Sequence, residues 1–198
     1  FTVGDYDATD AVAANTAFTG KIDEVEVFAG SLTADQVLIV YNANASSNFA
    51  VGTEESSQSV DGSGNPPVVW LSFEENSLNT CTGGSEDVCD RTGNDRDGLF
   101  ANNTHPAPNF LPGIMGSAVR LNNSTTSDSD YSRIELPDNT LNSTTAGTIE
   151  FWFKSDDSST WSFQAMAYVG DELGVQANGI EMAYNSTNNN FEFFQSGC

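Results

Sequence analysis

Acidic side chains are the main chemical resource of this sequence, and one of them stands where a strand would bury it. Asp and Glu number 28 among 198 residues, against six Lys and Arg and one His. Residues 20–28 read Gly-Lys-Ile-Asp-Glu-Val-Glu-Val-Phe, a β-branched pattern that predicts a strand. Strict alternation would set Asp23 on the same inward face as Val25 and Val27. Because a buried carboxylate needs hydrogen-bond donors or a cation, Asp23 is the leading candidate for an ion site.

The other acidic clusters and the single histidine are typical of loops. Ser127-Asp-Ser-Asp130 and the trio Asp87, Asp95 and Asp97 stand among turn-forming residues, so these carboxylates are predicted to be solvated. His105 follows Asn-Asn-Thr and precedes a proline, with no serine or cysteine nucleophile near it in the sequence. A catalytic triad is therefore not predicted.

Cysteine usage indicates an oxidising compartment. Cys81 and Cys89 bracket a polar stretch containing two glycines, which closes easily, so we predict a disulfide between them. A zinc site is the alternative, but two cysteines with only His105 available fall short of four ligands. Cys198 is the odd cysteine, and its partner is expected outside this sequence.

Charge and hydropathy exclude several classes of partner. A formal net charge of −22 leaves no basic stripe for nucleic acid or for anionic lipid. No apolar run approaches the roughly 20 residues that a membrane-spanning helix needs. A secreted or cell-surface location is predicted, and six Asn-x-Ser/Thr triplets are then glycosylation candidates: Asn44, Asn102, Asn122, Asn123, Asn142 and Asn185.

Short strand signals at intervals of ten to fifteen residues predict an all-β fold, an antiparallel jelly-roll sandwich. The clearest signals are residues 68–73 and 148–154. One short helix is predicted near residues 33–42, with Thr33 as N-cap and Gln36 completing a capping box. Its apolar stripe is Val37, Leu38 and Tyr41.

Two stretches resemble the laminin-G-like domain of the concanavalin-A-like sandwiches. Residues 18–28, Phe-Thr-Gly-Lys-Ile-Asp-Glu-Val-Glu-Val-Phe, with Leu32-Thr-Ala-Asp-Gln-Val37 and Tyr41, look like that family's closing strand and helix. The segments that look like its opening are residues 70–74, 90–94, 113–121, 134–137 and 147–154. The resemblance predicts residues 1–43 to close a first sandwich and residues 67–198 to open a second, with 44–66 as a flexible linker.

This order is reversed relative to a single domain, and three arrangements remain open. The chain is a window from a tandem array, a unit completed head to tail by its neighbours, or a permuted single domain. In the first two arrangements, residues 22–28 and 68–73 belong to different sandwiches. Either neighbouring repeats or copies of the chain itself are then the expected partners, because exposed strand edges must be paired.

The resemblance also implies a structural calcium at Asp23. Its companions by position are Glu74, after the first opening strand, and Asp90 or Asn94 in the next loop. Oxygen ligands of this kind suit Ca²⁺. Asp23 and the other residues fall in different repeats, so in a tandem array they would serve different ions.

Related sandwiches include glycoside hydrolases, but the carboxylate pair that they use is not evident here. Asp23-Glu24-Val25-Glu26 has the wrong parity, and Glu150 is alone on its strand face among Thr148, Trp152 and Lys154. Exposed aromatic rings stack on sugars, and the candidates for this are Trp152, Trp161 and Tyr131.

The function predicted from the sequence is therefore a non-catalytic extracellular module, structural or adhesive, in a larger surface or filament protein. The alternative is a carbohydrate-binding module of a secreted glycoside hydrolase, which would bind extracellular glycans. Fold class alone does not choose between them.

Overall fold

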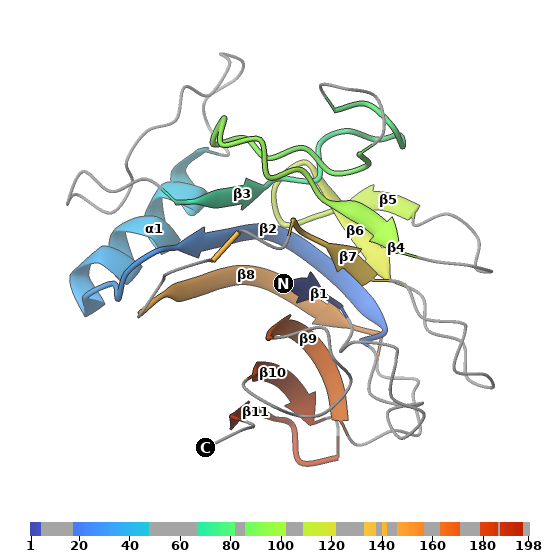
Figure 1. Ribbon diagram of the computed structural model, residues 1–198. Helices are drawn as coiled ribbons and strands as arrows, with labels where there is room; N and C mark the ends of the chain where they lie inside the picture. Colours follow the sequence, from blue (N-terminus) through green and yellow to red (C-terminus); the bar gives the residue numbers. More distant parts are fainter. Residues whose placement is uncertain are drawn as a thin grey trace.

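Two antiparallel sheets and one helix make up the described part of the chain (Figure 1). The computed structural model describes residues 1–4, 18–47, 67–81, 86–101, 109–121, 133–137, 140–141, 146–156, 163–170, 179–185 and 187–195. The all-β class predicted from the sequence is confirmed.

The first sheet, sheet A, has six strands in the order β11-β10-β9-β1-β7-β4. In chain order, these strands are β1 (Thr2–Val3), β4 (Leu99–Ala101), β7 (Arg133–Glu135), β9 (Phe163–Val169), β10 (Ile180–Asn185) and β11 (Asn190–Gln195).

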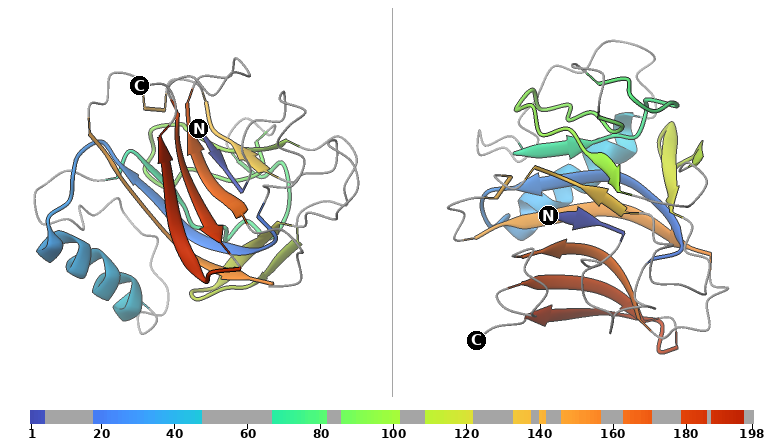
Figure 2. Two further views of the ribbon diagram at one scale, coloured as in Figure 1. Left: turned by 90° about the horizontal axis from the view of Figure 1, so that it is seen from below. Right: turned by 45° about the vertical axis from the view of Figure 1, so that its right-hand side comes forward.

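The second sheet, sheet B, is built around the longest strand, β2 (Gly20–Phe28). One edge of β2 pairs along its whole length with β8 (Thr148–Ser155). The other edge is shared by β3 (Val69–Leu71) and β6 (Ser117–Leu121), and β5 (Asn109–Pro112) pairs with β6. The two sheets face each other across the core (Figure 2).

The core lies between the inner faces of both sheets. Phe18 and Phe153 pack edge to face at 6.1 Å between ring centroids, and such contacts continue to β10 through Tyr184. The fully buried side chains include Val3, Ile22, Val25, Val27, Leu71, Phe73, Val119, Leu121, Ile134 and Met166. β-branched and aromatic residues thus occupy the inward positions, which is why these segments form strands.

The expected division into two sandwiches is wrong, because β2 and β3 are neighbours in one sheet of the same chain. Val25 pairs with Leu71 and Val27 with Val69. The entropic cost of closing a long connection rises only slowly with its length, which allows β2 to pair with distant strands of its own chain. This pairing satisfies the backbone groups on both edges of β2. This is the arrangement of the single-domain alternative. Of the expected linker, residues 44–47 belong to the helix and the rest lies outside the described residues.

The expected alternation along β2 is also wrong, because a β-bulge interrupts it. On β8, Trp152 and Glu150 are two residues apart, whereas their partners on β2, Asp23 and Glu26, are three apart. Glu24 lies within this irregularity with a φ of 50°. Ile22 and Val25 therefore both face the core, and Asp23 faces outward with Trp152 rather than inward with Val25.

The helix α1 (Ala34–Ser47) lies over the outer face of sheet B. The capping box is confirmed, since Thr33 Oγ1 accepts from Gln36 N–H and Gln36 Oε1 accepts from Thr33 N–H. Tyr41 packs against Trp152 of β8 at 5.4 Å between ring centroids. In the parts of the chain that are described, no helix has the length and apolar character needed to cross a bilayer.

Sheet A extends further than sheet B on the β8 side. β10 and β11 lie beyond β8 in Figure 1 and in the right-hand view of Figure 2. Among the described strands, β8 pairs only with β2, and β11 only with β10. We call this region the open side of the sandwich.

Candidate functional site

Two carboxylates hold the turn that joins β5 to β6. Asp23 Oδ2 accepts from Ile114 N–H at 2.7 Å and from Met115 N–H at 3.3 Å. Glu74 Oε1 accepts from Ser117 N–H at 2.9 Å. The turn approaches so closely that a Cβ atom on Gly113 would collide with the Asp23 carboxylate, which explains the glycine there.

Asp23 is the most strongly perturbed acid of the described region. Its side chain is only 3% exposed, and burial raises the pKa of its carboxyl from 3.8 to about 6, against the opposing effect of its backbone hydrogen bonds. The nearby Glu74 carboxylate raises this pKa further. Asp23 Oδ1 is buried and accepts no hydrogen bond. An orphaned carboxylate oxygen is a place for a proton or a cation.

The four residues predicted to hold calcium do not form one site. Asp23 and Glu74 meet at the β5–β6 turn, but Asp90 accepts from Trp70 N–H and from Thr92 in a separate loop. Asn94 donates to the carbonyl of Val68. Within the described residues, no group of three or more His, Cys, Asp or Glu side chains is placed to hold a metal ion. The Asp23–Glu74 pair thus fits a cation in part, through its orphaned oxygen, and would need carbonyl or water ligands as well.

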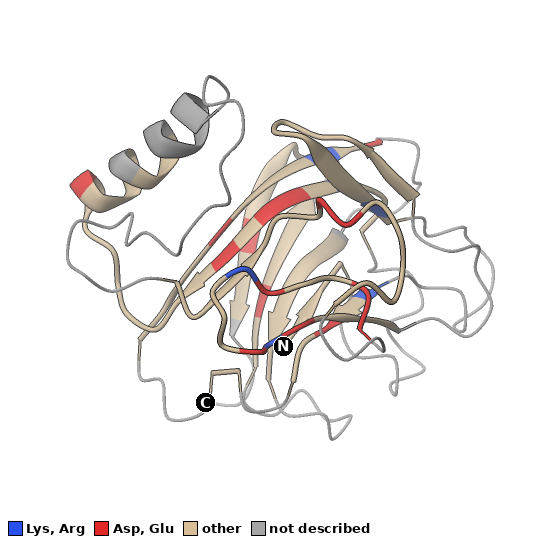
Figure 3. Ribbon diagram, turned by 90° about the horizontal axis from the view of Figure 1, so that it is seen from above, with Lys and Arg blue, Asp and Glu red and all other residues tan. Residues whose placement is uncertain are grey.

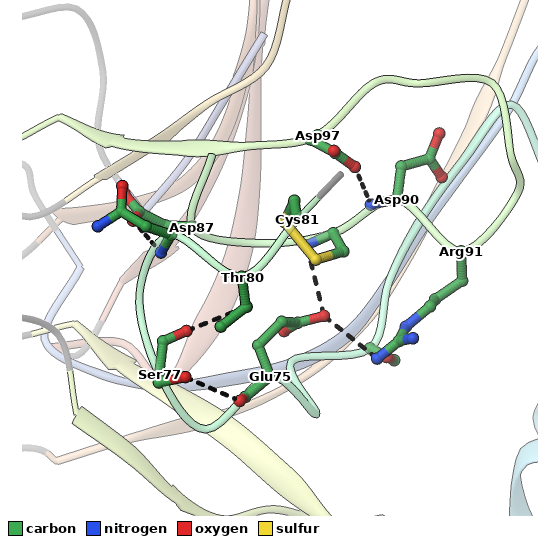
Figure 4. Close-up of a disulfide and its surroundings, with 11 residues drawn as sticks. Glu75, Ser77, Thr80, Cys81, Asp87, Asp90, Arg91 and Asp97 are labelled. Carbon is green, nitrogen blue, oxygen red and sulfur yellow. Dashed lines mark hydrogen bonds and ion pairs between the residues drawn. A yellow bond between two sulfur atoms is a disulfide. The ribbon is translucent and has the colours of Figure 1, made fainter. Parts of the chain in front are cut away.

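The loop after β3 is held by a disulfide and by carboxylates that accept from backbone N–H groups (Figure 4). The predicted bridge between Cys81 and Cys89 is confirmed, with Cα atoms 5.2 Å apart. Arg91 pairs with Glu75 beside the bridge. Asp87 was predicted to be solvated but is buried, and it accepts from the N–H groups of Asn79 and Phe100. In this loop, carboxylates accept from the backbone N–H groups that carbonyls of a neighbouring strand would satisfy in a sheet.

A row of acids crosses the outer face of sheet B (Figure 3). Glu24 Oε2 accepts from Trp70 Nε1 at 2.7 Å, and Glu26 stands opposite Glu150 in the β2–β8 register. Cross-strand partners share a face, so the acid beside Glu150 comes from β2, although Glu150 is alone among the residues of its own strand face. Burial raises the pKa of the Glu150 carboxyl. Strand pairing brings Glu26 and Glu150 together, and the bulge adds Asp23 to this face, opposite Trp152.

A groove of about 580 Å³ lies between α1 and β8. Its helix wall includes Val37, Leu38 and Tyr41, the predicted apolar stripe of the helix, which are 43%, 56% and 49% exposed. Its strand wall is residues 148–152 of β8, from both faces of the strand. The groove therefore reaches round the edge of β8 that β2 leaves free.

The open side also exposes the inner face of β10 and β11. Phe191 packs on Phe153 at 5.1 Å between ring centroids, which fixes that face of β11 as inward. Phe193 shares it by alternation and is 69% exposed. Ile180, at the start of β10, is exposed on the same face. Apolar side chains that belong to a core are thus left without a covering strand in the described part of the chain.

The remaining predicted residues are placed as follows. Trp152 faces outward but stacks on Tyr41, so one of its ring faces is covered. The Nδ2 atom of Asn185, where a glycan would attach, donates to Glu192 from a buried side chain in the β10–β11 turn. Nothing is described for the side chains of Trp161, Tyr131, Cys198, His105, Asn44, Asn102, Asn122, Asn123 and Asn142.

Comparisons with known proteins identify no family for this chain: no protein-family model, curated protein or solved structure matches it. The laminin-G-like resemblance and the jelly-roll topology therefore stay predictions.

Proposed function

We propose that this chain is a non-catalytic structural or adhesive module of a larger extracellular protein, joined to its neighbour by addition of a strand to β8. The unequal extent of the two sheets carries this proposal. β10 and β11 continue sheet A, whereas no described strand pairs with the free edge of β8. Edge strands with unpaired backbone groups are templates for strand addition.

The apolar surface on the open side supports strand addition. A strand placed beside β8 in sheet B would lie against the inner face of β10 and β11, where Ile180 and Phe193 are exposed. Burying apolar area is worth about 25 cal/mol per Å². A strand of alternating pattern would therefore gain both backbone hydrogen bonds and burial in the same place.

The laminin-G-like resemblance supports the same function. The stretches that carry it supply β2, β3, β6 and β8, which are four of the five strands of sheet B, and part of β7 in sheet A. The disulfide supports an oxidising compartment, and so a secreted or surface location. A neighbouring repeat of the same kind is the partner that these features favour.

The absence of catalysis is part of the proposal and rests on access. Glu26 and Glu150 are cross-strand neighbours, as a carboxylate pair for glycoside hydrolysis would be. Glu26, however, is only 2% exposed and does not line the groove in which Glu150 lies. Turnover of a β-glucan that Glu150→Gln abolishes would contradict this.

Carbohydrate binding is the second candidate, favoured by the pairing of Tyr41 with Trp152 beside a carboxylate in a groove. Aromatic faces and hydrogen-bonding acids are the usual elements of a sugar site. Binding to a glycan array that Trp152→Ala removes would establish this function in place of the first.

Cross-linking tests the proposed strand addition directly. A photo-reactive phenylalanine analogue at position 193 should cross-link to a neighbouring module of the larger protein rather than to another segment of the same chain. The same analogue at Leu99, which is 46% exposed on β4 at the opposite edge of sheet A, is the matched control. Equal, low cross-linking at both positions would show that the open side faces solvent and would contradict the proposal.

A further inference from the structure

The groove between α1 and β8 contains a carboxylate that no described side chain neutralises. The Glu150 carboxylate has no hydrogen bond or ion pair with any described residue, and it lies between the apolar helix wall and Trp152. Its neighbour across the strands is another acid, Glu26. A half-buried carboxylate in such surroundings is stabilised by a proton, by a hydrogen-bond donor or, in its charged form, by a cationic group.

All six cationic side chains of the chain lie among the described residues, and each is placed elsewhere. Lys154 is on the same strand face as Glu150 but four residues along, about 13 Å between Cα atoms. The other five make contacts away from the groove: Lys21 with the Pro112 carbonyl, Arg91 with Ser72 and Glu75, Arg96 with the Val68 carbonyl, Arg120 with Asp156, and Arg133 with Glu135. No Lys or Arg of the chain is thus placed to pair with Glu150, so a lysine or arginine that neutralised it would belong to another molecule.

We propose that the strand added to β8 carries a lysine or arginine facing Glu150, and that this side chain fills the α1–β8 groove. The inference rests on the proposed strand addition and names the feature by which β8 selects its partner. The groove reaches round the free edge of β8, so an added strand directs alternate side chains into it. The other side chains of that strand face β10 and β11 and are apolar.

The groove offers apolar surface for the stem of a lysine or arginine and polar surface for its charged head. The aliphatic stem would lie against Val37 and Leu38, and the charged head would lie between the Glu150 carboxylate and the ring of Tyr41. Long cationic side chains bury their stems on apolar surface while the head stays polar. Aromatic faces attract a cation in addition to the carboxylate.

A second copy of the chain, paired through β8, does not satisfy the geometry. Antiparallel pairing of two β8 strands about Trp152 would set Glu150 opposite Lys154 of the other copy. The two-fold axis of such a pair is perpendicular to the sheet, so both copies of sheet A would lie on the same side of it. β10 and β11 of each copy extend beyond β8 and would occupy the space of the other (Figure 1). The partner is therefore an extended segment rather than a second β8.

Selection of displayed peptides tests the inference. A library of randomised nine-residue segments is selected on the 198-residue chain, on Glu150→Gln and on Glu181→Gln. Glu181 is the matched control, because burial also raises its pKa but it lies on β10, on the opposite strand face from Met182 and Tyr184. Melting of each variant first establishes that it is folded.

The wild type and Glu181→Gln should both select alternating segments with Lys or Arg at one position of the polar face, and Glu150→Gln should lose that preference. In a synthetic peptide of the selected sequence, Lys→norleucine should weaken binding to the wild type about fivefold to tenfold, as expected for a partly buried charge pair. On Glu150→Gln the two peptides should bind alike.

The alternative outcomes separate this inference from the function on which it rests. Alternating segments without a basic preference would overturn the inference and leave strand addition standing. A preference for Lys or Arg that persists in Glu150→Gln would overturn the inference as well, since another acid would then bind the basic side chain. If no alternating segment is selected by any form, strand addition itself is wrong.

Discussion

The carboxylates along the two edges of β2 differ in whether they accept backbone hydrogen bonds. On the edge shared by β3 and β6, Asp23 and Glu74 accept backbone N–H groups of the β5–β6 turn, and Asp90 does the same in the next loop. On the β8 edge, the Glu150 carboxylate has no such donor among the described residues and faces a groove. Acids on the first side hold the chain together, whereas the acid on the second side is available to a partner. The role of a buried carboxylate can thus be inferred only when its hydrogen-bond donors are known.

Replacing a buried phenylalanine and a phenylalanine on the open side should give the largest difference in the free energy of unfolding. Phe18 is fully buried against Phe153, so Phe18→Ala should lower the free energy of unfolding by about 3–5 kcal/mol. Phe193 is 69% exposed, and Phe193→Ala should change that free energy by no more than about 0.5 kcal/mol. Urea unfolding of both variants measures the difference. A large loss from Phe193→Ala would mean that the open side is covered within the chain.

The pH dependence of stability should be set in part by Asp23. Its pKa is raised in the folded state, so the unfolded state ionises first and stability falls as pH rises from about 4 to about 6. A rise from 3.8 to about 6 corresponds to at most about 3 kcal/mol at 1.36 kcal/mol per unit. Asp23→Asn keeps an acceptor for Ile114 and should remove this fall. Unfolding measured at pH 4 and pH 7 gives the comparison, and equal pH dependence in both proteins would be contrary to it.

The effect of calcium on Tm should also distinguish Asp23 from Glu150. If a cation occupies the place beside the orphaned oxygen of Asp23, calcium should raise the Tm of the wild type at pH 7 and have a smaller effect on Asp23→Asn. Glu150→Gln serves as the control acid and should respond to calcium as the wild type does. The same Tm with calcium and with excess chelator would refute the ion site and leave Asp23 as a carboxylate that holds a turn.

A pair of glycines gives a smaller effect. A Cβ on Gly113 would meet Asp23 and the backbone at Ala118, so Gly113→Ala should destabilise the fold by about 1–3 kcal/mol. Gly30 has nothing within 4 Å of an added Cβ, and Gly30→Ala should be neutral or slightly stabilising. Thermal melting of the two variants decides this, and equal Tm values would argue against the close approach of the turn to Asp23.

Local features of this fold were predictable from the sequence, whereas contacts between distant segments were not. The capping box at Thr33 and the bridge from Cys81 to Cys89 depend on residues a few positions apart, and both were predicted correctly. The pairing of Val25 with Leu71 joins segments that the family resemblance assigned to different domains. No local propensity indicates whether a strand pairs within its own chain or with a neighbour.

The outward position of Asp23 was missed because one residue changed the parity of β2. Glu24 adopts a left-handed φ, which is uncommon for a residue other than glycine, and the strand then shifts by one position. A signal for it was present: the apolar residues Ile22 and Val25 are three apart, which strict alternation cannot place on one face. Asp23 was correctly chosen as a buried carboxylate, but for a face that it does not occupy.

Amide hydrogen exchange on the isolated chain tests the central claim most directly, namely that β2 is an interior strand and β8 an edge that awaits a partner. Slow exchange is predicted along β2 where β3, β6 and β8 flank it, whereas only alternate amides of β8 should be slow, since every second N–H points away from β2. A peptide selected on the chain should slow the remaining β8 amides and leave those of β2 unchanged. Uniformly slow exchange along β8 in the isolated chain, or alternate protection along β2, would contradict the account.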